Sequence, residues 1–206
     1  ATTSKSYTQD GAARSFYGLS ELPENFDTLL ICEGELDVLA LQTAFDACGT
    51  TNIGVVSVPN GAPIKIRENS RIDSSEDGKF RYVWESKDLL EGVDKIILCC
   101  DDDAPGVALS EELARRIGRA KCWQVKLPDG CKDANDVLLL EGSKSLNDLV
   151  ENSLPVPLVG VYQAADYKNE VVNLYKQGVG SGVSTGIASV DELFTILPGQ
   201  MSIVTG

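Results

Sequence analysis

Two apolar runs of strand length, each followed by carboxylates, constrain the fold of this chain more than any other feature. The first run, residues 28–32, leads into Glu33, and the second, residues 95–100, leads into Asp101 and Asp103. A helical pattern follows each run. In a parallel α/β sheet the carboxyl ends of the strands meet at one edge, which forms the ligand crevice. The three carboxylates are therefore expected to converge, although 68 positions separate Glu33 from Asp101.

Carboxylates gathered at one edge need a compensating charge. They repel one another by roughly 1–4 kcal/mol per pair at ~4 Å, for effective dielectrics of ~80 down to ~20. A bound divalent cation removes this repulsion, and oxygen-only ligands suit magnesium. Gly34 allows a sharp turn beside a ligand, and Asp37 lies one helical turn beyond Glu33 on the same face. As an alternative, the helix dipole alone favours an acid such as Asp37 in a first turn.

The chain up to about residue 152 alternates between strand and helix patterns. Strands are expected at 28–32, 53–58, 95–100 and 122–127, and helices at 36–47, 83–90, 107–117 and from 132–136 onward. Alternation at this spacing predicts βαβ units. The expected fold class is α/β, with a central and mostly parallel sheet flanked by helices.

Composition limits the class of protein. The 206 residues are 43% hydrophobic and 24% charged, as in soluble globular proteins, and no apolar run reaches transmembrane length. The net charge of −13 argues against simple coating of nucleic acid, but not against a metal-dependent site. The six cysteines form no CxxC pair and histidine is absent, which excludes a zinc site of the usual spacing. Cysteines inside apolar strands indicate reduced thiols in a reducing intracellular compartment.

The acidic motifs, taken in order along the chain, resemble the Toprim fold of primases and topoisomerases. They are Glu33-Gly34, Asp101-x-Asp103 and Lys132-Asp133-Ala134-Asn135. A narrower resemblance, to the primase–helicases of the Twinkle and phage T7 type, is carried by the segments 16–19, 58–63, 103–106 and 132–136. Together these resemblances cover nearly the whole chain.

The resemblance implies four parts in this chain. Residues 1–26 are expected to be the end of an upstream primase subdomain, and residues 27–152 a Toprim catalytic domain. Residues 153–183 are expected to form a linker with an amphipathic helix, and residues 184–206 the truncated start of a RecA-like helicase domain. Gly206 falls where the first glycine of a phosphate loop would lie. The chain is therefore expected to be a fragment that lacks the helicase NTPase site.

The function implied by the resemblance is metal-dependent synthesis of short RNA primers on single-stranded DNA from nucleoside triphosphates. Glu33, Asp101 and Asp103 would hold Mg²⁺ or Mn²⁺, with no zinc in this region. Glu33 would alternatively act as a general acid or base. Lys132 would contact phosphate, and Asp133 would bind the metal or support its ligands.

The remaining predicted site residues, expected to approach or support the bound cofactor, are Gly34, Asp37, Gly106 and Asn135. Two other interpretations stay open. One is another Toprim enzyme, of the nuclease or topoisomerase type. The other is a non-catalytic Toprim module for DNA binding and ring assembly, which the retained acids Glu33, Asp101 and Asp103 disfavour.

Assembly and location are also implied by the resemblance. The full-length protein is expected to be a ring hexamer and this fragment a monomer, without membrane association. The expected location is the cytoplasm of a bacterial or phage-infected cell, or a mitochondrion or plastid for a eukaryotic Twinkle-like protein.

Overall fold

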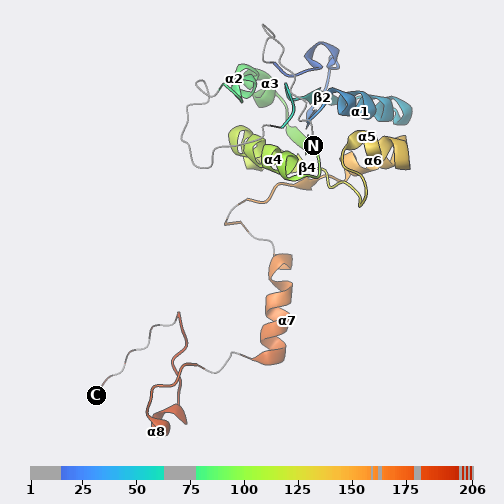
Figure 1. Ribbon diagram of the computed structural model, residues 1–206. Coiled ribbons are helices and arrows are strands. Elements are labelled where there is room, and N and C mark those ends of the chain that lie inside the picture. The colour runs from blue at the N-terminus through green and yellow to red at the C-terminus, as the bar shows by residue number, and fades with distance from the viewer. Residues whose placement is uncertain are drawn as a thin grey trace, which may run out of the picture. The chain divides into compact units, whose positions relative to one another are not determined.

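A computed structural model describes residues 15–62, 78–158, 160–161, 164–178, 182–199, 201, 203 and 205 (Figure 1). The chain divides into two compact units, Ala1–Leu158 and Val159–Gly206. Most of the expected upstream part, residues 1–14, lies outside the described residues, as do residues 63–77.

A five-stranded sheet forms the centre of the first unit, in the order β2-β1-β3-β4-β5. The strands are β1 (Thr28–Cys32), β2 (Ile53–Ser57), β3 (Lys95–Cys99), β4 (Cys122–Gln124) and β5 (Leu154–Pro155). Strands β1 to β4 pair in parallel, and β5 pairs with β4 in antiparallel orientation. The predicted α/β class with a mostly parallel sheet is confirmed.

Helices cover both faces of this sheet (Figure 1). One layer contains α1 (Glu35–Cys48), α5 (Ala134–Glu141) and α6 (Ser143–Glu151), and the other contains α2 (Arg81–Glu85), α3 (Lys87–Gly92) and α4 (Ala104–Ile117). Two short 3₁₀ helices, η1 (Leu19–Glu21) and η2 (Arg119–Lys121), complete the unit.

The strands are apolar at nearly every position because both faces of the sheet are covered. All five residues of β1 are buried. Successive side chains point to opposite faces, so Leu29 and Ile31 pack in the cluster that contains Leu113 of α4. Leu30 packs in the opposite cluster with Leu41 of α1. This double burial explains why short apolar runs in the sequence identified the central strands.

Several element boundaries differ from the sequence expectation. Helix α4 begins at Ala104 instead of residue 107, because Asp103 caps it and a proline is compatible with its first turn. The helix expected at 83–90 is split into α2 and α3. Strand β4 has three residues instead of six, and residues 154–155, expected as linker, pair with it as β5.

The second unit contains one substantial helix, α7 (Lys168–Gln177), preceded by η3 (Ala164–Tyr167) and followed by the short helix α8 (Ala188–Asp191). Helix α7 corresponds to the predicted amphipathic helix, and its apolar residues, among them Val171 and Leu174, are exposed within this unit. Among the described residues, no helix combines the length and apolar character needed to cross a lipid bilayer.

Candidate functional site

The register of β1 and β3 brings the two acidic motifs to one edge of the sheet. Cys32 lies opposite Cys99, so Glu33 is level with Cys100 and one position before Asp101, close enough for the charge of Asp101 to raise the pKa of Glu33. The Oε1 atom of Glu33 accepts a hydrogen bond from the backbone N–H of Ala62 at 3.0 Å. Its Oε2 atom is buried, and no hydrogen-bond partner for it lies among the residues that the structure describes. One carboxylate oxygen at this edge is therefore anchored by the backbone.

The donor to Glu33 comes from a tight turn after β2. Asn60 and Gly61 both have φ of 66°, in the left-handed region, which asparagine and glycine tolerate best. This turn presents the Ala62 N–H to Glu33. An Asn-Gly pair is a turn signal in any sequence, but only the fold reveals that this turn supplies a hydrogen-bond donor to the carboxylate.

Lys132 is the counter-ion of the second acidic motif. Its Nζ atom lies 2.7 Å from Oδ2 of Asp101 and 3.5 Å from Oδ2 of Asp103. The Asp101 side chain is mostly buried, whereas that of Lys132 is 56% exposed. The charge and hydrogen bond of Asp101 hold the pKa of the Lys132 ammonium above its usual range. The lysine predicted to meet phosphate therefore neutralises carboxylates in this structure.

Backbone hydrogen bonds join the segments that carry these groups. The N–H of Asp102 donates to the carbonyl oxygen of Lys132 at 2.9 Å. The N–H of Lys132 donates to Oδ2 of Asp136 at 3.0 Å. Asp133, predicted to bind metal or support its ligands, caps α5 by accepting a hydrogen bond from the Asp136 N–H at 2.7 Å. The predicted Lys132–Asp136 element is thus a rigid helix start beside the acidic edge.

Asp37 connects the beginnings of two helices that lie far apart in sequence. Its Oδ2 atom accepts a hydrogen bond from the N–H of Gly34 at 3.2 Å, and its Oδ1 atom accepts one from the N–H of Asn135 at 3.3 Å. Burial, and then the negative charge of Asp133, raise the pKa of Asp37 to about 6. Gly34, Asp37 and Asn135, all predicted as cofactor-binding, are thus linked to one another.

Gly106 allows α4 to approach the end of β3. A Cβ atom at this position would lie 2.2 Å from the carbonyl oxygen of Asp101. The N–H of Gly106 donates to Oδ1 of Asp103 at 2.9 Å, which fixes the helix cap. Any larger residue at position 106 would overlap the backbone of Asp101. The glycine therefore allows Asp101 and Asp103 to lie close to the helix.

The electrostatics of Glu33 suit proton or cation binding. Burial raises its pKa above the usual value, the backbone N–H groups of Ala62 and Asp101 lower it, and the charges of Asp101 and Asp103 raise it. Among the described residues, these carboxylates share the edge with the ammonium group of Lys132, and each additional negative charge favours uptake of a proton or a cation.

The donor set fits a hard divalent cation in chemistry. Glu33 offers a buried oxygen that has no partner in the described part of the chain, and oxygen ligands are those that magnesium prefers. In the part of the chain that the structure describes, no three or more carboxylate, thiol or imidazole groups are placed to hold one metal ion together. The Lys132 ammonium lies against the two aspartates. The assignment of Glu33, Asp101, Asp103 and Asp133 to metal stays a prediction.

Comparison with known proteins agrees with the motifs. Residues 28–126 match the Toprim domain family. The chain is 36% identical over 200 residues to the Twinkle homolog protein, chloroplastic/mitochondrial, of Arabidopsis thaliana, which covers 94% of this chain and 27% of that protein. It is 38% identical over 161 residues to the Primase homolog protein of the same plant, which covers 75% of this chain and 45% of that protein.

A solved structure is also similar in fold. It contains bacteriophage T7 lagging-strand DNA polymerase interacting with primase domains of two gp4 subunits. The matched chain is 24% identical in sequence, with a TM-score of 0.48, and the match covers 64% of this chain and 57% of that chain. The resemblance predicted from the motifs is confirmed by the family match and the plant relatives. This chain spans less than half the length of each plant relative.

The raised pKa of Asp37 predicts a pH-dependent stability. A carboxyl group whose pKa is higher in the folded state contributes stability that is complete below about pH 4 and is lost as the pH rises through about 6. We expect the free energy of unfolding of the wild type to fall between pH 4 and pH 8 by about 3 kcal/mol more than that of Asp37→Asn, whose side chain does not titrate. The asparagine offers one acceptor oxygen to the two N–H groups of Gly34 and Asn135, so the variant should be the less stable protein near pH 4. Urea unfolding at both values measures this. Asp46→Asn, at an exposed position of the same helix, is the control, and equal effects of the two substitutions contradict the prediction.

The close approach at Gly106 predicts a large cost for any side chain there. We expect Gly106→Ala to lower the free energy of unfolding by about 3 kcal/mol, because the methyl group overlaps the Asp101 carbonyl oxygen. Gly92→Ala is a matched control, since it lies at the end of α3 with nothing within 4 Å of its added Cβ, and it should change stability by less than about 1 kcal/mol. Thermal unfolding of both variants tests this prediction, and equal midpoint temperatures for the two variants contradict the steric role of Gly106.

Proposed function

We propose that this chain, in which residues 28–126 form a Toprim domain, is the primase part of a replicative primase–helicase. It would synthesise short RNA primers on single-stranded DNA from nucleoside triphosphates, with Mg²⁺ or Mn²⁺. The observation that carries the proposal is the placement of Glu33 and the Asp101–Lys132–Asp103 group at one edge of the sheet. The printed names of the plant relatives, a Twinkle homolog and a primase homolog, support it.

The proposed chemistry divides among the residues of this edge. Asp101, Asp103 and the Oε2 atom of Glu33 would hold the cation, which when bound lowers the pKa of the attacking 3′-hydroxyl and neutralises charge on the phosphoryl group. Glu33, with its raised pKa, is suited alternatively to accept or return the hydroxyl proton. Asp133 would fix the position of Lys132 through the α5 cap.

Lys132 would alternate between two anions. Its exposed side chain is bound to the aspartates in the structure, and a lysine ammonium is also a common point-charge ligand for phosphate. Entry of a nucleotide would offer the lysine a phosphate group as a second partner. The hydrogen bonds of Asp37 with Gly34 and Asn135 would hold the first turns of α1 and α5 in fixed relative positions while Lys132 changes partner.

The properties of the whole protein are proposed from its relatives. We infer a ring hexamer for the full-length protein, with α7 as the linker helix and residues 184–206 as the start of the helicase domain. The chain on its own would be monomeric. An organellar location follows from the name of the Twinkle homolog, chloroplastic/mitochondrial.

A non-catalytic module is the second candidate, and one observation favours it. The Lys132 ammonium already occupies the space between Asp101 and Asp103, as a permanent structural ion pair would. A Toprim nuclease or topoisomerase would share the same acids. A measurement of metal affinity tests the non-catalytic alternative, and a measurement of primer synthesis tests the nuclease or topoisomerase alternative.

Competition between Lys132 and metal predicts opposite effects of two substitutions. Lys132→Gln removes the competing ammonium, so we expect Mn²⁺ to bind this variant about tenfold more tightly than the wild type. The double variant Asp101→Asn, Asp103→Asn should bind at least about tenfold more weakly. Isothermal titration with Mn²⁺ measures both affinities, and Lys144→Gln, at an ion pair on α6, is the control. Equal affinities in all four proteins oppose a cation site at this edge.

Glu33 should be essential for synthesis. We expect Glu33→Gln in the full-length protein to lower primer synthesis by about 100-fold or more and to leave ATP-driven unwinding intact. Glu35→Gln, at an exposed position two residues away, should retain wild-type synthesis. Extension of labelled ribonucleotides on a single-stranded template measures the activity. Unchanged synthesis by Glu33→Gln places the reaction elsewhere, and loss of unwinding indicates a folding defect.

A further inference from the structure

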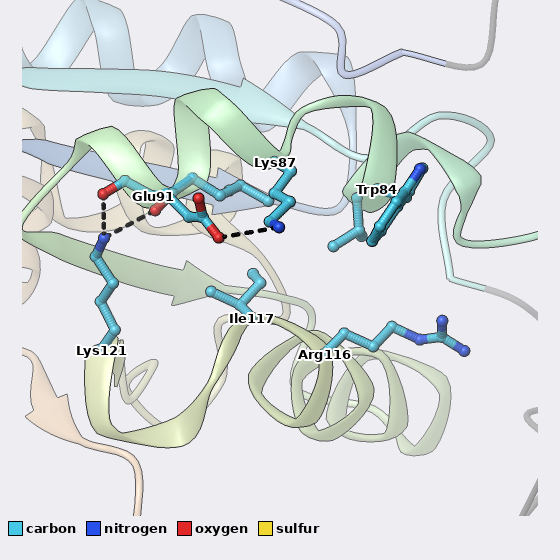
Figure 2. A pocket seen from close by; sticks show the side chains of 8 residues that line it. Trp84, Lys87, Glu91, Arg116, Ile117 and Lys121 are labelled. Atoms are coloured by element: carbon cyan, nitrogen blue, oxygen red, sulfur yellow. Dashed lines mark hydrogen bonds and ion pairs between the residues drawn. The ribbon is translucent and has the colours of Figure 1, made fainter. Parts of the chain in front are cut away.

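A second concave site lies at the other end of α4. It is a pocket of about 180 Å³ between α2 and α3 on one side and the end of α4 with η2 on the other (Figure 2). Its lining residues are Val83, Trp84, Lys87, Leu90, Glu91, Arg116, Ile117 and Lys121. Helix α4 has 14 residues, so roughly 20 Å separates this pocket from the acidic edge where the helix begins. The pocket is therefore distinct from the site already described.

The pocket is held open by fixed contacts. The Nζ atom of Lys121 donates to the carbonyl oxygens of Leu90 and Glu91, both at 2.9 Å, which ties η2 to the end of α3 (Figure 2). The Nζ atom of Lys87 lies 3.5 Å from Oε1 of Glu91 and 5.5 Å from the centre of the Trp84 ring. These contacts place the walls in position before any ligand arrives.

The lining is apolar at its base and aromatic at its rim. Leu90 is 5% exposed, whereas Trp84, the largest side chain of the lining, is 48% exposed. Figure 2 shows Ile117 beneath the space, with Trp84 and Lys87 to one side. A space of this size accepts one large side chain or ring, and exposed tryptophans beside such pockets are typical anchors of protein interfaces.

The surrounding surface has a charge opposite to that of the rest of the chain. Segments 78–92 and 111–121 contain seven of the 18 lysines and arginines but only five of the 31 aspartates and glutamates. Arg115 and Arg116 are both held by Glu112, and Arg116 also lies 4.3 Å from the centre of the Phe80 ring. The Arg116 side chain is 8% exposed, whereas those of Lys87 and Arg115 are 52% and 54% exposed. Exposed cations beside an apolar pocket are complementary to an acidic segment that carries an apolar anchor.

From these features we propose that the pocket is a docking site for an acidic peptide segment of a protein partner. One aromatic side chain of the segment inserts beside Trp84, and its flanking carboxylates face the exposed cations Lys87 and Arg115. A nucleic-acid strand is less suited, because Glu91 and Glu112 lie among the cations and repel a continuous row of phosphates. The inference goes beyond the proposed function and does not depend on it.

The test uses the 206-residue chain and a short acetylated and amidated peptide in which one phenylalanine is flanked by aspartates. We expect saturable shifts of amide NMR signals in α2, α3 and the end of α4. Trp84→Ala should weaken binding by about tenfold or more. Lys87→Glu should weaken it by about fivefold, whereas Lys144→Glu, which breaks an exposed pair of the same spacing on α6, should not. Circular dichroism checks that each variant is folded.

Several outcomes overturn the proposal. The absence of saturable shifts does so, as does binding that survives Trp84→Ala and Lys87→Glu in folded protein. A peptide with alanine in place of phenylalanine that binds equally well shows charge attraction only, which also overturns it. Oligothymidylate that shifts the same signals at lower concentration assigns the surface to nucleic acid instead. Primer synthesis by Trp84→Ala should match the wild type, so failure here and failure of the primase proposal are distinguishable.

Discussion

The parallel pairing of β1 with β3 is the constraint on which the acidic site depends. Cys32 stands opposite Cys99, so Glu33, which directly follows Cys32, is level with Cys100 and one position before Asp101. A slip of one residue would turn every side chain of β1 to the opposite face. Because both faces of β1 are buried, the fit of individual side chains opposes such a slip, with Leu30 in one core and Ile31 in the other. The packing of the two cores thus holds Glu33 near the acids that follow β3.

Concentrating acids at one edge is electrostatically unfavourable, and the fold offsets it with hydrogen-bond donors from backbone segments. The pairs are Ala62 N–H with Glu33, Gly106 N–H with Asp103, Gly34 and Asn135 N–H with Asp37, and Asp136 N–H with Asp133. Most of these donors belong to the first turns of helices, where backbone N–H groups have no partner within the helix. Lys132 adds a full positive charge. This arrangement accounts for a folded acidic edge, where no described residue donates to the buried Oε2 atom of Glu33.

Sequence reasoning located β1, α1 and β3 to within about two residues, because buried apolar runs and helix caps are local signals. It overestimated β4 and missed β5, because three residues of β4 are in the sheet only where β3 and residues 154–155 supply partners. The same limit applies to the site. The carboxylates were identified from their positions after strands, but the Ala62 donor depends on the path of the chain after Asn60, which no local pattern encodes.

Helix α4 connects two surfaces of opposite character. Its first turn is shaped by Asp103 and Gly106 and borders the acidic edge, whereas its last turn presents Arg116 and Ile117 to the second pocket. A net charge of −13 would repel an acidic partner from most of this chain. The cations held at the far end of α4 create a local exception, about one helix length from the carboxylates. The proposed cation chemistry at one end of α4 and the proposed recognition of an acidic segment at the other are thereby kept apart, so that neither would compete with the other for the same charges.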